Sequence, residues 1–323
     1  MKEVKNDHPR IITQRYKINA IKQHFKRILG YDLNLSAPRT FNEKIQWMKL
    51  YCRDPLITKC SDKYAVRQYV EKKIGNEYLI PLVGKGVYKN ANDIDFETLP
   101  DKFVLKITDG WSNNIICNDK SNLDLSETRS ILNSWLNKGN SHYYRNFEWA
   151  YKNIKPRIIC EEFIEQTGET GLLDYKFWCF NGHVEMILVC GERNAHLRKE
   201  NYFDRDWNPL VLSLRNITGN RTVPQPKKLK QIIYLSELLS KDFPFVRVDV
   251  YIPDSDIKFG ELTFYPSNGT LPFVPKEWDD KLGDLFVLPK KSFVFPFELN
   301  KRKTHLRAVI KNISKTSVVA HEK

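Results

Sequence analysis

Two short runs in the second half of the chain carry side chains that together could hold a metal ion against phosphate. Arg247 and Asp249 alternate in FVRVDVY, and Glu261 and Thr263 alternate in IKFGELTF, so each pair lies on one face of a predicted strand. If the two strands form a hairpin, two carboxylates and a guanidinium converge. Close carboxylates repel unless a cation lies between them, and Mg²⁺ prefers such oxygen ligands together with phosphates. The alternative is a surface hairpin with alternating charges.

Basic side chains further upstream are candidates for contacts with phosphate. Lys106 ends the predicted strand FVLKIT, and the loop TDGWSNN that follows offers small residues and backbone donors. Lys63 and Arg67 are four residues apart in the predicted helix SDKYAVRQYV and face the same direction. Both features have ordinary alternatives, because lysines often end edge strands and cover solvated helix faces.

A third group of polar residues follows the run VEMILVC. Arg193, His196, Arg198 and Tyr202 fall within twenty residues, in VCGERNAHLRKENYFDRDWN. Such a cluster behind a strand suits an anionic acceptor or an acyl phosphate, and the alternative for His196 is an ordinary loop histidine. The chain has no Walker loop, no Rossmann fingerprint and no Ser-His-Asp or Cys-His pattern.

The composition indicates a globular protein of more than one lobe. The chain has 323 residues, 41% of them hydrophobic and 28% charged, and single cores stop growing near 250 to 300 residues. No apolar run approaches the ~20 residues of a membrane helix, and the charged start MKEVKNDHPR does not resemble a signal peptide. Six scattered cysteines without CxxC spacing predict buried thiols in a reduced, cytoplasmic protein rather than a zinc site.

The net charge of +13 is concentrated at the two ends. Residues 1–53 hold 12 Lys and Arg against 4 Asp and Glu, and residues 290–323 hold 9 against 2. The ends therefore suit docking to an anionic membrane surface, an acidic polysaccharide or nucleic acid, although they could equally be solubilising faces. The nearly neutral middle argues against a binding protein for nucleic acid.

The order of the predicted elements indicates an α+β chain with mostly antiparallel sheets, each covered by helices on one side. We expect helices up to Gly30, from Thr40 or Asn42, and from Ser61 or Asp62 to Gly75. A buried strand YLIPLVGKGVY follows, and Asn181-Gly182 predicts a hairpin turn. The predicted divisions are a basic helical extension, a first lobe, a nucleotide-binding domain and a basic tail, at residues 1–55, 56–100, 101–289 and 290–323.

Several of these strings, in this order, resemble one branch of the ATP-grasp superfamily. FNEKIQWMKLY, SDKYAVRQYV, DYKFWCFNG, RVDVY and GELTFYPSNG are similar to the TupA-like family of teichuronopeptide and capsular polysaccharide biosynthesis. The resemblance runs from about Asn34 to Pro289. It implies an ATP-grasp fold, in which two α+β lobes grip ATP.

The resemblance also implies roles for individual residues. In this family a lysine at the start of the nucleotide lobe and another on a later strand meet the phosphates, matching Lys63 and Lys106, with Ser112 in the phosphate loop. The acidic strand end forms the adenine hinge, an acidic residue about ten residues later meets the ribose, and the Arg-x-Asp and Glu-x-Asn strands hold the metal. The matching residues here are Glu161, Glu162, Phe163 and Ile164 for the hinge, Asp174 for the ribose, and Asp249, Glu261 and Thr263 for the metal, with Thr263 replacing the usual Asn. For Glu161 and Glu162, the alternative is a charged strand end at the surface.

The activity implied is ligation of a carboxylate to an amine, with ATP and Mg²⁺ forming an acyl phosphate and releasing ADP and phosphate. The catalytic candidates are Lys176, Arg193, Arg198 and Arg247. We expect an amino acid or amine and a uronic acid saccharide as substrates, no nucleic acid, and peripheral contact of the basic ends with an anionic membrane, through a helix at residues 301–315. The alternatives are a glycosyltransferase, a kinase acting on a glycan hydroxyl, and a binding protein for acidic glycans.

Overall fold

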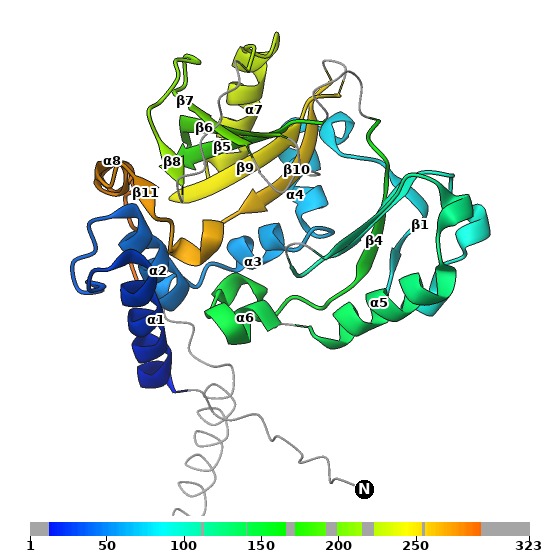
Figure 1. Ribbon diagram of the computed structural model, residues 1–323, viewed down its shortest axis with the longest axis horizontal. Coiled ribbons are helices and arrows are strands. Elements are labelled where there is room, and N and C mark those ends of the chain that lie inside the picture. Colours follow the sequence, from blue (N-terminus) through cyan, green and yellow to red (C-terminus); the bar gives the residue numbers. More distant parts are fainter. Residues whose placement is uncertain are drawn as a thin grey trace, which may run out of the picture.

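The computed structural model gives the positions of most of the chain (Figure 1). The described residues are 13–110, 113–139, 141–165, 172–191, 199–214, 223–253 and 256–291. Ser112, Arg193, Arg198 and the predicted membrane helix at residues 301–315 lie outside these ranges. Two main antiparallel sheets organise the described residues, and helices α3 (Pro55–Ser61) and α4 (Val66–Ile74) lie between them.

The first sheet, sheet A, has four strands in the order β1-β4-β2-β3. They are β1 (Leu82–Tyr88), β2 (Phe103–Ile107), β3 (Asn114–Cys117) and β4 (Ile158–Glu162). Alternate residues of β2 are fully buried against helix α5 (Leu125–Asn137) and make a separate hydrophobic core. The prediction of a buried strand near residue 82 is wrong for the first half of β1, because this edge strand leaves Gly84 and Lys85 exposed.

The second sheet, sheet B, has five strands in the order β10-β9-β5-β6-β7. They are β5 (Asp174–Phe180), β6 (His183–Gly191), β7 (Lys199–Phe203), β9 (Phe245–Tyr251) and β10 (Lys258–Thr263). The predicted hairpin turn is confirmed, since Asn181 and Gly182 join β5 to β6 with φ of 50° and 87°. Helix α7 (Leu229–Ser240) packs on β5, β6 and β9.

The N-terminal helices belong to the core of sheet B. Helix α1 (Gln14–Leu29) ends at Gly30, and α2 (Phe41–Tyr51) begins with a capping box in which Thr40 and Glu43 each bond the other's backbone. Phe41 of α2 is fully buried within a group of aromatic rings formed by Trp178, Phe180, Phe245, Phe273 and Phe286. Phe286 follows helix α8 (Glu277–Leu285), and Phe273 lies in β11 (Phe273–Val274), which pairs with β8 (Ser213–Leu214). The predicted domain limits stay predictions.

The helix predicted from Ser61 or Asp62 to Gly75 begins later than expected. Helix α3 ends at Ser61, and the Asp62 carboxylate accepts backbone N–H bonds from Tyr64 and Ala65 at 2.8 and 3.0 Å, which stabilises a turn. Helix α4 starts only at Val66. Lys63 therefore lies in the turn and not on one helix face with Arg67. The C-terminal prediction is confirmed at Gly75.

Strand β10 contains a bulge that reverses its alternation. The register between β9 and β10 shifts between Phe259 and Glu261. Phe259 pairs with Val250, and Glu261 pairs with Asp249. Because Val250 and Asp249 are neighbours on β9 and point to opposite faces, Phe259 and Glu261 also lie on opposite faces. Gly260 fits at this point because a Cβ there would lie 3.0 Å from the Asp249 carbonyl oxygen. The bulge thus turns Glu261 away from the core side that Phe259 occupies.

Two further observations concern the cysteines and the hydrophobicity of the helices. All six cysteines are buried thiols, as the sequence predicted. Among the described residues, none of the helices combines the length and the apolar character that crossing a bilayer requires.

Candidate functional site

The hairpin of β9 and β10 brings the Arg-x-Asp and Glu-x-Thr side chains together as predicted. Glu261 pairs with Asp249 in the register, and Thr263 pairs with Arg247. Arg247 donates to both carboxylate oxygens of Asp249, from Nε to Oδ1 and from Nη2 to Oδ2, each at 2.6 Å. Its Nη2 also lies 3.0 Å from Thr263 Oγ1 and 3.4 Å from Glu261 Oε1. The Thr263 hydroxyl donates to Glu261 Oε1 at 2.8 Å.

Strand β5 adds a lysine and a third carboxylate to this group. Lys176 pairs with Asp249 in the register, and its Nζ lies 2.5 Å from Asp249 Oδ2 and 2.6 Å from Asp174 Oδ2. All three side chains are buried. Burial alone would lower the pKa of Lys176, but Asp249 and Asp174 raise it above its ordinary value. We call Asp174, Lys176, Arg247, Asp249, Glu261 and Thr263 the charge cluster.

Sheet A carries a second set of charges. Lys106 on β2 donates to Glu161 Oε2 on β4 at 2.5 Å, and Arg67 of α4 lies 3.4 Å from Glu161 Oε1. The Glu161 side chain is only 9% exposed, so the alternative of a surface charge at this strand end is wrong for Glu161. Its carboxylate instead fixes two cations on the inner part of sheet A.

Lys63 connects the two sets of charges. Its ammonium donates to the Gly110 carbonyl oxygen at the end of sheet A. Burial lowers the pKa of Lys63, and Lys106 lowers it further, while Glu261 and Glu161 oppose this shift. Burial would raise the pKa of Glu261, but Lys63, Arg247 and Lys176 together lower it to about 2. Glu261 therefore stays ionised at neutral pH, near cations from sheet B and from the turn that precedes α4.

The residues predicted to form the adenine hinge and to meet the ribose lie at the end of β4 and on β5. Glu162 is exposed, and its backbone N–H donates to the Pro81 carbonyl oxygen at 2.9 Å. Phe163 and Ile164 follow β4 as partly buried residues. Asp174, the residue predicted to meet the ribose, lies against Lys176 in the charge cluster. The hinge and ribose roles of these residues stay predictions.

The donor set of the charge cluster fits a magnesium ion that also binds phosphate. Mg²⁺ commonly takes one or two protein carboxylates and completes its octahedron with phosphate oxygens and water. Asp249 and Glu261 are opposite each other on β9 and β10 and would supply those two carboxylates. Within the described ranges, no three His, Cys, Asp or Glu side chains are grouped to hold a metal by themselves. Thr263 already bonds Glu261 and Arg247 through its hydroxyl, so a third protein ligand there stays a prediction.

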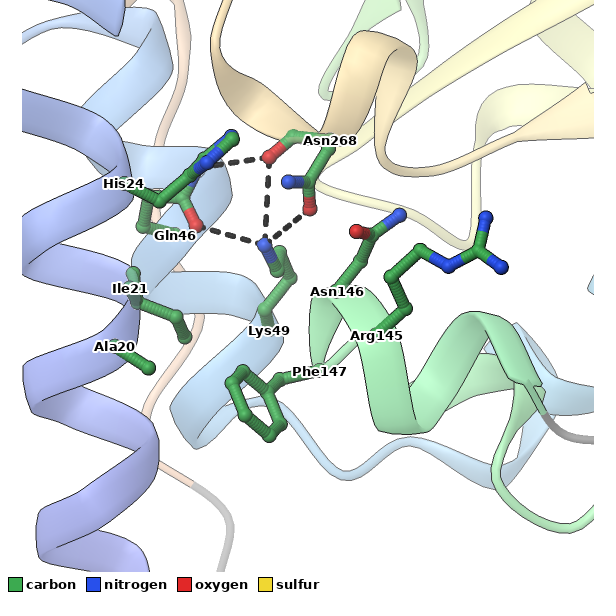
Figure 2. Close-up of a pocket in the computed structure, with 9 residues that line it drawn as sticks. All are labelled: Ala20, Ile21, His24, Gln46, Lys49, Arg145, Asn146, Phe147 and Asn268. Atoms are coloured by element: carbon green, nitrogen blue, oxygen red, sulfur yellow. Dashed lines mark hydrogen bonds between the residues drawn. The ribbon is translucent and has the colours of Figure 1, made fainter. Parts of the chain in front are cut away.

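Sequence reasoning missed a buried lysine beside this site. Lys49 of α2 is 2% exposed and lines a polar pocket of about 100 Å³ together with Asn268 (Figure 2). Lys49 lies four residues after the core residue Ile45 and therefore on the same face of α2. This spacing is the sequence signal that could have predicted its burial. Arg67 was a candidate because of its spacing from Lys63, but its contact with Glu161 was not predicted.

A profile of the family described as TupA-like ATPgrasp matches residues 43–287. The chain belongs to this family. The ATP-grasp fold predicted from the sequence is therefore confirmed, as is the family resemblance. No curated protein sequence matches the chain.

Solved ligases of the same superfamily are similar to the chain at low identity. The L-amino acid ligase from Bacillus licheniformis is 13% identical with a TM-score of 0.47, over 88% of this chain and 65% of that one. The D-alanine–D-alanine ligase from Helicobacter pylori is 11% identical with a TM-score of 0.43, over 79% and 68%. The D-alanine–D-alanine ligase from Bacillus anthracis, complexed with ATP, is 15% identical with a TM-score of 0.39, over 70% and 64%. The chain thus spans about two thirds of the length of these ligases.

Proposed function

We propose that this protein is an ATP- and Mg²⁺-dependent ligase that joins a carboxylate to an amine. The observation that carries the proposal is the meeting of Arg247, Asp249 and Glu261 at the β9–β10 hairpin, where Lys176 adds a second cation. Family membership supplies the ATP-grasp fold, in which charged side chains grouped in this way would hold a nucleotide. Phosphoryl transfer concentrates negative charge on few oxygens, so fixed cations are the main catalytic contribution that a protein offers.

Residues of the charge cluster and of sheet A, together with Lys63, have separate roles in this proposal. Asp249 and Glu261 would hold Mg²⁺, which when bound neutralises phosphate charge. Lys63 and Lys106 would bind phosphate oxygens, and Glu161 orients Lys106 for that contact. Arg247 spans Asp249, Glu261 and Thr263 and fixes the geometry of the carboxylates.

The reaction proceeds in two displacements. A substrate carboxylate oxygen attacks the γ-phosphorus of ATP, the bond to the β-phosphate oxygen breaks, and ADP leaves. The amine then attacks the acyl carbon of the acyl phosphate, phosphate leaves, and the amine gives up a proton as the amide forms. A free amine needs no general base of its own.

We further propose that the carboxylate belongs to a uronic acid of a bacterial surface polysaccharide and that the amine is an amino acid or a simple amine. The support is the TupA-like character of the sequence motifs, together with the net positive charge of residues 1–53 and 290–323, which suits acidic saccharides or an anionic membrane surface.

The test is to measure ADP, phosphate and pyrophosphate release from ATP in a matrix of uronic acids and amines. Ligation predicts ADP and phosphate only when both a carboxylate and an amine are present, with an amide detected by mass spectrometry. ATP consumption with a saccharide alone, giving a phosphorylated sugar and no free phosphate, would instead identify a kinase. Cleavage of a nucleotide sugar without ATP would identify a glycosyltransferase. Asp249→Asn should abolish the ATP-dependent signals.

A further inference from the structure

The pocket missed by the sequence reasoning lies where the N-terminal helices meet the loop after β10. Its walls come from α1, α2, α6 (Ser141–Asn146) and the short helix η7 (Pro266–Gly269). Figure 2 shows the Lys49 ammonium at its centre, pointing to Asn268. The pocket is therefore a junction between the helical N-terminal segment and the loop that continues the Glu-x-Thr strand.

Helix α2 holds this loop by four hydrogen bonds from two side chains, and a fifth joins those two side chains. Lys49 Nζ donates to the Asn268 side-chain oxygen at 2.5 Å, to the Asn268 carbonyl oxygen at 3.4 Å and to Gln46 Oε1 at 2.8 Å. Gln46 Nε2 donates to the carbonyl oxygens of Asn268 and Gly269 at 2.8 and 2.6 Å. Lys49 thus bonds the loop directly and also orients the amide of Gln46 that bonds it.

The backbone of the loop needs such support. Ser267, Asn268 and Gly269 are three consecutive residues with positive φ, at 45°, 60° and 65°. Most residues with a Cβ are disfavoured in this region, so contacts from α2 help to keep Ser267 and Asn268 there, beside the local bond from the Asn268 N–H to the Tyr265 carbonyl oxygen. Gly269 also lies so close to α2 that a Cβ would be 2.4 Å from the Ile45 side chain.

The supported loop is next to the charge cluster. Thr263 ends β10, and Pro266 begins η7 three residues later. Behind Lys49 lies the buried Glu148, whose charge raises the pKa of Lys49 against the lowering effect of burial. The loop that Lys49 holds thus directly continues the strand that carries Glu261 and Thr263.

We propose that Lys49 is a positioning residue: it holds Ser267, Asn268 and Gly269 in their left-handed conformation and so fixes the end of β10 that carries Glu261 and Thr263. The inference rests on the proposed function for its effect on catalysis. It makes the N-terminal helices part of the active site although they contribute no group to the reaction.

The experiment compares Lys49→Met with Lys44→Met. Lys44 is on the same helix and also donates to two carbonyl oxygens, of Gly283 and Phe286, both at 2.8 Å, but these lie at α8 and not at the loop. We expect Lys49→Met to raise the Mg²⁺ concentration for half-maximal ADP release about tenfold, the usual size of an effect on groups that orient metal ligands. Lys44→Met should lower the denaturation midpoint but keep the wild-type Mg²⁺ dependence.

Two further measurements keep the inference testable. Asn268→Ala removes the side-chain acceptor of Lys49 and should reproduce the Mg²⁺ shift if Lys49→Met does not fold. Hydrogen exchange of the peptide covering residues 258–270 should accelerate in Lys49→Met and stay unchanged in Lys44→Met, independently of any activity. Wild-type Mg²⁺ dependence and wild-type exchange in both Lys49→Met and Asn268→Ala would overturn the inference. If the wild type shows no ligase activity but hydrogen exchange of this peptide still accelerates in Lys49→Met, only the proposed function is overturned.

Discussion

Arg247 and Asp249 are two residues apart on β9 and are joined by two parallel hydrogen bonds of 2.6 Å, from Nε and Nη2 of the guanidinium to the two carboxylate oxygens. The fork of an arginine matches a carboxylate in this way, and the single ammonium of a lysine does not. Because Nη2 also contacts Thr263, the arginine connects strands β9 and β10 through one planar group.

Arg247→Lys should therefore behave as a severe substitution despite keeping the charge. We expect ADP release to fall about 100-fold and the free energy of unfolding to fall by about 1 to 3 kcal/mol, since buried Asp249 loses part of its hydrogen bonding. Steady-state kinetics and urea denaturation measure the two effects. Arg205→Lys is the matched control, because Arg205 pairs with Glu237 and is 46% exposed; exposed pairs contribute about 1 kcal/mol or less. Equal effects of the two substitutions would contradict the prediction.

Lys63→Met should weaken nucleotide binding more than it weakens the fold. The variant removes the cation that faces both Glu261 and Glu161, so the KM for Mg²⁺-ATP should rise about tenfold or more, as for a lost charged contact worth about 1.5 to 3 kcal/mol. The rise in Tm caused by Mg²⁺ and a non-hydrolysable ATP analogue should shrink in parallel. Lys59→Met, which removes only an exposed bond to Gln68, should keep the full ligand-induced shift.

Gly269→Ala should destabilise the protein more than Gly30→Ala. Both glycines have positive φ, at 65° and 79°, so both substitutions incur a backbone cost of about 1 to 2 kcal/mol. A Cβ at Gly269 also meets Ile45 and Gln46, whereas a Cβ at Gly30 meets nothing within 4 Å. Overpacking adds about 1 to 3 kcal/mol, and the difference between the two denaturation midpoints measures that clash. Equal midpoints would show that α2 moves aside without cost.

Glu148→Gln should change how stability depends on pH. Burial raises the pKa of Glu148 from 4.5 to about 7, against the lowering effects of Lys49 and of a hydrogen bond from Asn146. The folded protein binds this proton more tightly than the unfolded chain, so the stability it contributes is complete below pH 4.5 and is lost as the pH rises through about 7.

The variant lacks this titration and should therefore gain stability relative to the wild type as the pH rises across the same window. Urea denaturation of both proteins at several pH values tests this. A constant difference between them from pH 4.5 to 7 would mean that Glu148 is already ionised throughout the window.

The elements that a local pattern determines could be predicted from the sequence. The alternation around Arg247 and Glu261 predicted two strands with polar side chains on one face, and the Asn181-Gly182 turn predicted a hairpin, because these signals depend on neighbouring residues alone. The same holds for the Thr40 cap of α2, whose Glu43 completes a capping box.

What could not be predicted depends on partners distant in the sequence. Glu161 looked like a charged strand end, but Lys106 and Arg67 make it a buried ion-pair residue. Lys49 was not among the candidates from the sequence, and only the packing of the loop after β10 shows that its charge is buried. Local periodicity contains no information about such long-range pairing.

The bulge at Gly260 makes the end of β10 that carries Glu261 and Thr263 sensitive to chain length. Edge strands usually accept an inserted or deleted residue with little harm, but removing Gly260 would restore regular alternation and exchange the inward and outward sets of side chains beyond it. Leu262 would then lie on the side of the charge cluster, and Glu261 on the side of the hydrophobic core. In homologous sequences that keep the charge cluster, we thus expect the residue types of β10 to vary more freely than the number of residues in the strand. A single-residue gap at Gly260 is therefore a practical marker of a relative that has lost the site.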